Sequence, residues 1–272
     1  MPMLIVTLFA VVLIACLTGQ PYFQRLRRRR LRAKPFPAPW RTILRRRVPS
    51  VAGLPTDLQT QLKQHIQVFV AEKTFIGCRG QRITDEVRVT IAAQACLLLL
   101  NRPDHYFPYL RQVLVYPDSF VVPRGHTDGM GIVHHGHAVL AGESWEQGQV
   151  VLSWQDVLAG AATQDDGHNV VIHEFAHQLD QESGGANGAP PLTKPSHYRR
   201  WSKVFNFEYE ALQLCVERGE ASLLDAYGAT SPAEFFAVAT EVFFERPRDL
   251  ERLHSDLYEE LALFYRVNPA GW

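Results

Sequence analysis

The residues best suited to chemistry lie in the stretch Val-Val-Ile-His173-Glu174-Phe-Ala-His177-Gln-Leu-Asp180. His173 and His177 are four positions apart, so on a helix both imidazoles project from one face, one turn apart. That spacing allows both rings to bind one Zn²⁺ at ~2.1 Å. Glu174 lies beside the first histidine, where its carboxylate could take a proton from a metal-activated water. The stretch therefore predicts a zinc peptidase site. A chance match is the alternative, because the pattern fixes only three positions.

The apolar turn before this motif, Val170-Val171-Ile172, predicts that the helix begins inside the core. A catalytic zinc usually takes three protein ligands and leaves one position for water. The extended motif that supplies a third histidine is excluded, because Asp180 and Ser183 occupy its glycine and histidine positions. A carboxylate some twenty residues downstream is also excluded, since residues 183–207 contain no Asp or Glu.

The best candidate for the third ligand is Glu234, near a helix start marked by Ser231 and Pro232. The same spacing is a capping box, in which the backbone amides would satisfy the Glu234 carboxylate. Spacing alone leaves these two roles open. Glu241 lies two turns further along the same face and could either support a histidine or be the ligand itself.

Hydrophobic periodicity predicts an α+β domain with more helix than strand. Helices are expected over residues 56–73, 84–100, 168–181, 196–218, 232–245 and 255–265, and strands over residues 113–116, 119–122 and 150–154.

The N-terminal part of the chain has a different composition from the rest. Residues 3–19 are almost wholly apolar, and the run Arg25-Leu-Arg-Arg-Arg-Arg30 follows them. This order of charge predicts an uncleaved transmembrane helix over residues 1–20, with everything after it in the cytoplasm. Prolines then recur between residues 33 and 55, so residues 21–54 are expected to be a stiff basic linker. The sequence thus predicts a single-pass inner-membrane protein with its catalytic domain at residues 55–272.

The formal net charge of zero hides an asymmetry along the chain. Residues 1–47 carry eleven Arg or Lys and no acid, which leaves 28 − 11 = 17 bases against 28 acids in the rest. Because the body is acidic, nucleic acid is excluded as its partner.

Several further motifs carry a resemblance to a known family. They are Gly131-Ile-Val-His134, Ser144-Trp-Glu-Gln-Gly148, the His173–His177 stretch, Asp225-Ala-Tyr227 and Ser231-Pro-Ala-Glu234-Phe-Phe-Ala-Val, together with Thr84-Asp-Glu-x-Arg88. Over roughly residues 55–270 the chain resembles the Mlc titration factor A family of zinc peptidases. That family is distantly similar to the catalytic domain of anthrax lethal factor, a gluzincin.

The resemblance implies a mostly helical zincin-like domain with a small β-sheet. It implies that His173, His177 and Glu234 bind Zn²⁺ and that Glu174 is the general base. It further implies an active-site role for His134, as an additional metal contact, and a Tyr227 hydroxyl that stabilises the oxyanion. Taken alone, Tyr227 reads as a residue at a loop–helix corner and His134 as one of three clustered histidines.

Two functions follow from the resemblance. The first is a peptidase acting on a peptide or protein substrate. The second is a regulatory protein that sequesters a glucose-responsive transcriptional repressor, with proteolysis secondary. Glu174 favours the enzyme, because binding alone has no use for a base beside the metal.

Overall fold

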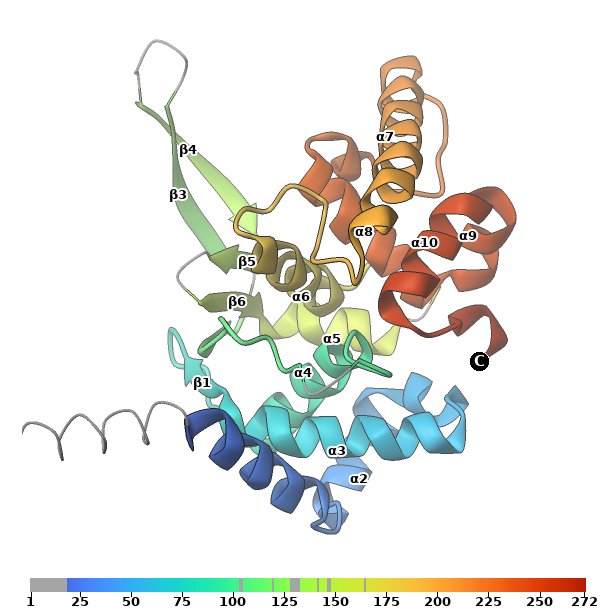
Figure 1. Ribbon diagram of the computed structural model, residues 1–272. Helices are drawn as coiled ribbons and strands as arrows, with labels where there is room; N and C mark the ends of the chain where they lie inside the picture. The colour runs from blue at the N-terminus through green and yellow to red at the C-terminus, as the bar shows by residue number, and fades with distance from the viewer. Residues whose placement is uncertain are drawn as a thin grey trace, which may run out of the picture.

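The computed structural model describes residues 19–102, 105–118, 120–127, 133–140, 142–145, 148–163 and 165–272, with only the backbone described from 120 to 145. Most of this part is helical, and a small sheet lies along one side of the helices (Figure 1). The predicted α+β class, with more helix than strand, is confirmed.

The sheet has four strands in the order β1-β2-β6-β5. They are β1 (Thr74–Gly77), β2 (Gln112–Tyr116), β6 (Gln149–Ser153) and β5 (Gly142–Trp145). The first three run parallel, and β5 runs antiparallel to β6 at the edge. Alternate residues of β2, Val113 and Val115, are buried, so one face of this strand packs on the helices. A separate antiparallel hairpin, β3 (Phe120–Thr127) and β4 (Val133–Leu140), extends away from the helices (Figure 1).

The helices are α2 (Ala38–Arg47), α3 (Thr56–Glu72), α4 (Asp85–Leu97), α5 (Trp154–Ala162), α6 (Val170–Asp180), α7 (Pro195–Arg218), α8 (Pro232–Glu245), α9 (Pro247–Leu253) and α10 (Ser255–Tyr265). The central one is α4, in which every residue from Val89 to Leu97 is buried. It contacts α2, α3, α5 and α6. A helix that is apolar all round must be enclosed in this way.

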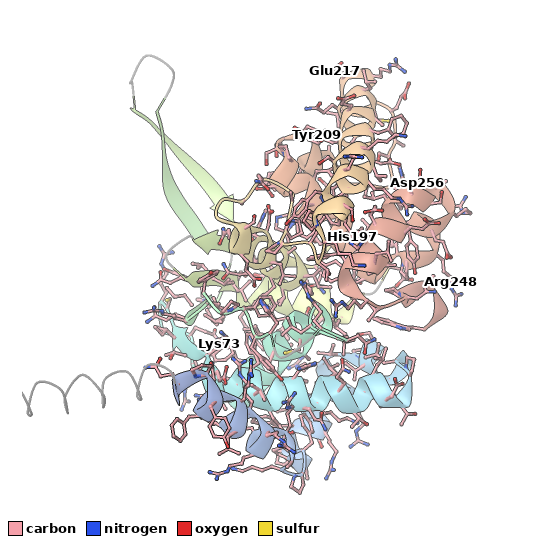
Figure 2. The ribbon with its side chains drawn as sticks, viewed as in Figure 1. Lys73, His197, Tyr209, Glu217, Arg248 and Asp256 are labelled. Carbon is pink, nitrogen blue, oxygen red and sulfur yellow. The ribbon has the colours of Figure 1, made fainter. Side chains whose placement is uncertain are left out.

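Two further contacts join segments that are far apart in the sequence. At the end of α3, the Lys73 ammonium donates to the carbonyl oxygens of Phe107 and Leu110 at 2.7 and 2.8 Å, which ties the chain before β2 to this helix (Figure 2). The second contact is between α6 and α8, which pack against each other.

The outer half of α7, marked by Tyr209 and Glu217, extends beyond the neighbouring helices (Figure 2).

Residues 21–54 differ from the stiff linker that the prolines predicted. Residues 19–32 are helical, α2 follows, and residues 49–53 form a 3₁₀ helix. The reason is that prolines stand at helix starts, where a missing N–H costs nothing. The Arg28 guanidinium forms a two-pronged salt bridge with Glu72, at 2.9 and 2.7 Å, and Leu44 and Val48 are buried in the core. This segment is therefore packed on the body.

The predicted transmembrane helix covers residues 1–20, of which 1–18 lie outside the described residues. In the part of the chain that the structure describes, no helix combines the length and the apolar character needed to cross a membrane. The prediction of a single-pass inner-membrane protein is therefore wrong for the chain that the structure describes.

Candidate metal centre

The helix that carries the histidines begins at a strong cap. The Asn169 side chain accepts a hydrogen bond from the Ile172 amide at 3.1 Å, which satisfies one of the free N–H groups of the first turn. Val171, Ile172 and Phe175 are buried, so α6 lies inside the core as the apolar turn predicted. A helix packed in this way holds its side chains in fixed directions.

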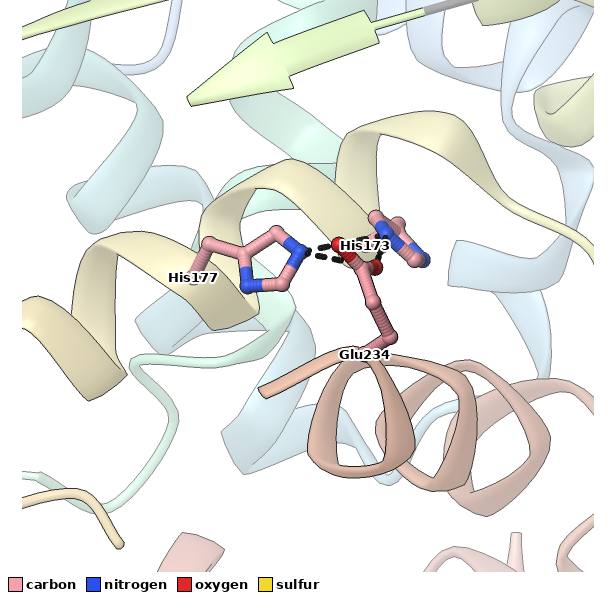
Figure 3. Close-up of side chains that lie close together, drawn as sticks. All are labelled: His173, His177 and Glu234. Carbon is pink, nitrogen blue, oxygen red and sulfur yellow. Dashed lines mark hydrogen bonds and ion pairs between the residues drawn. The ribbon is translucent and has the colours of Figure 1, made fainter. Parts of the chain in front are cut away.

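Three side chains from two helices meet beside α6 (Figure 3). Glu234 Oε2 lies 3.0 Å from His173 Nε2 and 3.2 Å from His177 Nε2, and the two nitrogens are 3.2 Å apart. Ligands about 2.0–2.1 Å from a tetrahedral zinc stand about 3.3–3.4 Å from one another. The triangle of potential ligand atoms therefore needs to open by only a few tenths of an ångström around such an ion. Two imidazoles and one carboxylate are also a donor set that zinc prefers.

The Ser231 half of the predicted capping box is present, and the Glu234 carboxylate has the histidines as its partners. The Ser231 hydroxyl accepts a hydrogen bond from the Glu234 amide at 3.2 Å, so the backbone takes part in a helix cap. The Glu234 carboxylate lies against His173 and His177. The cap uses the Glu234 N–H, which leaves its side chain available to the histidines.

Glu241 contacts the opposite edge of the first histidine. Its Oε1 lies 2.7 Å from His173 Nδ1, and its Oε2 accepts a hydrogen bond from the Asn169 amide at 2.5 Å. Of the two carboxylates that the sequence offered, Glu234 therefore faces both histidines and Glu241 supports one of them from behind.

The histidines and carboxylates of this cluster shift one another's pKa values. Burial lowers the pKa of His173, but hydrogen bonds to Glu234 and Glu241 outweigh this effect, so its pKa lies well above its ordinary value. Burial raises the pKa of Glu234, but hydrogen bonds from His173 and His177 outweigh it and hold the pKa below its ordinary value. The carboxylates thus favour positive charge between them, and a divalent cation would supply that charge.

Glu174 is held in an unusual environment beside these groups. Its side chain is buried, and burial raises its pKa to about 7 despite the opposing influence of His173 and His177. Its Oε2 has no hydrogen-bond partner among the described residues. A buried carboxylate with an unused acceptor atom, beside three potential metal ligands, is chemically suited to take up a proton.

The two remaining predicted site residues are Tyr227 and His134. Tyr227, in the 3₁₀ turn Ala226–Ala229, has its ring centroid 6.1 Å from that of His173, and its side chain is half-exposed. It therefore borders the cluster. His134 pairs with His126 along the β3–β4 hairpin. The His134 side chain lies outside the described residues, so its contact with a metal stays a prediction.

Comparison with known proteins places the chain in a family. The profile of the glucose-regulated metallopeptidase M90 family matches residues 23–266. The chain belongs to this family. The M90 match includes residues 23–54, in agreement with their packing on the body.

Relatives extend over most of the chain. An uncharacterized protein of Synechocystis sp. is 40% identical over 270 residues, which is 99% of this chain and 98% of the relative. Proteins named Mlc titration factor A from Yersinia pestis and Yersinia pseudotuberculosis are each 34% identical over 225 residues, or 82% of both chains. The resemblance to Mlc titration factor A is thus confirmed, and the more distant likeness to lethal factor stays a prediction.

Sequence reasoning missed the residues that connect α6 to its surroundings in this M90 chain. Asn169 is one of them, although an Asn directly before an apolar helical run is a recognisable cap signal. Asp180 is another, and its side chain accepts a hydrogen bond from the Gly188 amide at 2.7 Å. It therefore holds the loop after α6 in place.

Gly188 should be intolerant of substitution. Its φ is +76°, and an added Cβ would lie 2.4 Å from the Pro232 carbonyl oxygen at the start of α8. We expect Gly188→Ala to lower the free energy of unfolding by more than about 2 kcal/mol, through left-handed strain and this clash. Urea denaturation measures the loss. The matched control is Gly185→Ala in the same loop, where nothing lies within 4 Å of the new Cβ and stability should hardly change. Equal stabilities of the two variants would contradict the close packing.

Glu245 should make stability depend on pH. Burial raises its pKa to about 8, a hydrogen bond from Asn169 opposes this, and Asp166, Glu241 and Asp165 add to it. The folded chain thus holds a proton that the unfolded chain releases near pH 4.5, so this contribution to stability falls as pH rises towards 8.

Glu245→Gln removes that contribution and keeps an acceptor for Asn169. Relative to the parent, the variant should gain up to about 1.4 kcal/mol per pH unit between pH 5 and 8. Urea unfolding of both chains across this range tests it. A stability difference that is independent of pH would show that Glu245 does not titrate there.

Proposed function

We propose that this M90 chain is a zinc-dependent peptidase of the gluzincin type. The observation that carries the proposal is the convergence of His173 Nε2, His177 Nε2 and Glu234 Oε2 within 3.0–3.2 Å of one another, with buried Glu174 on the same helix. The two histidines and Glu234 would hold the ion. Bound zinc would supply Lewis acidity, polarising the scissile carbonyl and lowering the pKa of water.

The chain's own residues would then move the protons. Glu174 would take a proton from the attacking water and pass it to the leaving amine, from its buried position on the helix that carries both histidines. The Tyr227 hydroxyl donates a hydrogen bond to the developing oxyanion from its place beside His173. The family resemblance adds His134 as a further metal contact.

The sheet offers a way to hold the substrate. β5 is the edge strand of the four-stranded sheet and contacts α6. Extended peptides bind such edges through main-chain hydrogen bonds. A peptide paired with β5 would pass beside the histidine helix, which supports a peptide or protein as substrate.

A chelator experiment tests this function. The purified full-length chain is incubated with a mixture of quenched fluorescent peptides, with and without 1,10-phenanthroline. We expect cleavage that the chelator abolishes and that added Zn²⁺ restores. Cleavage that survives metal removal, or no cleavage of any peptide by the zinc-loaded chain, would contradict the proposal.

The names of the relatives favour a second function. Proteins called Mlc titration factor A, 34% identical to this chain, suggest that it also binds an Mlc-type repressor. The variant Glu174→Gln separates the two functions, because it should bind the repressor as the parent does and lose most of its peptide cleavage. Affinity of the parent chain for the repressor, measured by calorimetry, decides whether the second function exists.

A further inference from the structure

We propose that Glu241 is a positioning residue that fixes the ring of His173 and the start of α6 at the same time, so that α8 assembles the metal site before the ion arrives. The inference rests on the zinc site of the proposed function. It goes further in assigning Glu241 to the assembly of that site.

The two oxygens of the Glu241 carboxylate bind different targets. Oε1 contacts His173 Nδ1 at 2.7 Å, and Oε2 accepts from the Asn169 amide at 2.5 Å. The side chain is buried, which strengthens both contacts. A carboxylate at Nδ1 keeps the proton on that nitrogen and leaves the Nε2 lone pair for a metal.

The ring of His173 is consequently held from both sides by one helix. Glu234 lies 3.0 Å from Nε2 and Glu241 lies 2.7 Å from Nδ1, and the two carboxylates are two turns apart on α8. Rotation of the ring would break both contacts. The position of His173 is therefore set by α8, although the residue belongs to α6.

The second contact of Glu241 fixes the helix itself. Asn169 caps α6 through Oδ1, and its Nδ2 donates to the Gly160 carbonyl and to Glu245 Oε1. Space around this asparagine is tight, because a Cβ on Gly160 would lie 3.1 Å from the Asn169 Cα. Glu241 thus joins α8 to a rigid corner between α5 and α6.

Glu245 provides a matched control. It lies one turn after Glu241 on α8 and contacts the same asparagine, but its hydrogen bond goes to the Asn169 side chain and it is no part of the site. Glu241→Gln and Glu245→Gln therefore each replace one carboxyl group on α8 with an amide, at positions one turn apart. Only the first of these changes removes a carboxyl group from the histidine.

The test measures the zinc affinity of the full-length parent and both variants at pH 7 by competition with a chromophoric chelator. We expect Glu241→Gln to weaken zinc binding about 10–100-fold, as losses of a ligand's supporting carboxylate do. Glu245→Gln should bind zinc as the parent does. Parental zinc affinity in a folded Glu241→Gln chain would overturn the inference, and so would equal losses in both variants.

A second measurement needs no variant to fold. In the zinc-loaded parent, nitrogen-15 NMR of the imidazoles should show His173 protonated at Nδ1 and metal-bound at Nε2. Binding of zinc through Nδ1 would overturn the inference. Because both readouts report on the metal, a chain that binds zinc in this way without cleaving peptides would contradict the proposed function alone.

Discussion

Glu234→Gln should fold nearly normally and lose both its zinc and its peptidase activity. The Ser231 cap uses the Glu234 backbone N–H, so it survives the substitution. The carboxylate that faces His173 and His177 becomes an amide, which is a poor zinc ligand. Loss of a direct ligand should exceed the roughly 10–100-fold that supporting residues are worth. Chelator competition and a fluorescent peptide assay measure the two losses, and circular dichroism checks the fold.

Ser231→Ala is the complementary control. It removes the hydroxyl that caps α8 and keeps the Glu234 carboxylate. We expect it to cost about 0.5–2 kcal/mol of stability and to retain zinc. If a folded Glu234→Gln chain instead kept parental zinc affinity, the Glu234 carboxylate would be no zinc ligand.

Glu174→Gln should keep the metal and lose turnover. The three potential ligand atoms belong to other residues, so zinc affinity should stay close to that of the parent. Glutamine has nearly the same shape but cannot accept a proton, and general bases contribute typically about 10²–10⁴-fold to the rate. Peptide hydrolysis should fall by about this factor in the zinc-loaded chain. Unchanged turnover at full zinc occupancy would make Glu174 a structural residue.

The local part of the site could be predicted from the sequence because it depends on helix geometry. His173, Glu174 and His177 lie within two turns, and the apolar residues before them indicate a buried helix. Side chains four residues apart on a helix point from the same face, whatever the rest of the chain does. The structure accordingly brings the two imidazole nitrogens together at 3.2 Å.

For the third ligand, the sequence offers two candidate carboxylates on one helix and does not decide between them. Glu234 and Glu241 are both on α8, more than fifty residues beyond His177, and only tertiary packing sets which of them faces the histidines. The capping-box pattern did not separate the alternatives, because the Ser231 hydroxyl caps the Glu234 backbone amide while the Glu234 carboxylate contacts the histidines. No local feature of the sequence indicates that the Ser231 cap and the carboxylate–histidine contacts occur together.

The structure of the N-terminal segment could not be predicted, for a different reason. Its prolines predict a stiff basic linker, but proline is equally suited to the first turn of a helix. What decides between them is a contact across the chain, namely the partly buried salt bridge of Arg28 with Glu72, 44 residues away. The short strand β1 and the edge strand β5 were likewise missed, because four residues are too few to show a period of two.

A bound zinc ion is the central feature of the proposed site. Elemental analysis of the full-length chain, purified without chelators and dialysed, measures zinc per polypeptide. Two imidazoles and one carboxylate at these separations predict about one tightly bound zinc per chain. A chain that is folded and contains no tightly bound metal would contradict the proposed site.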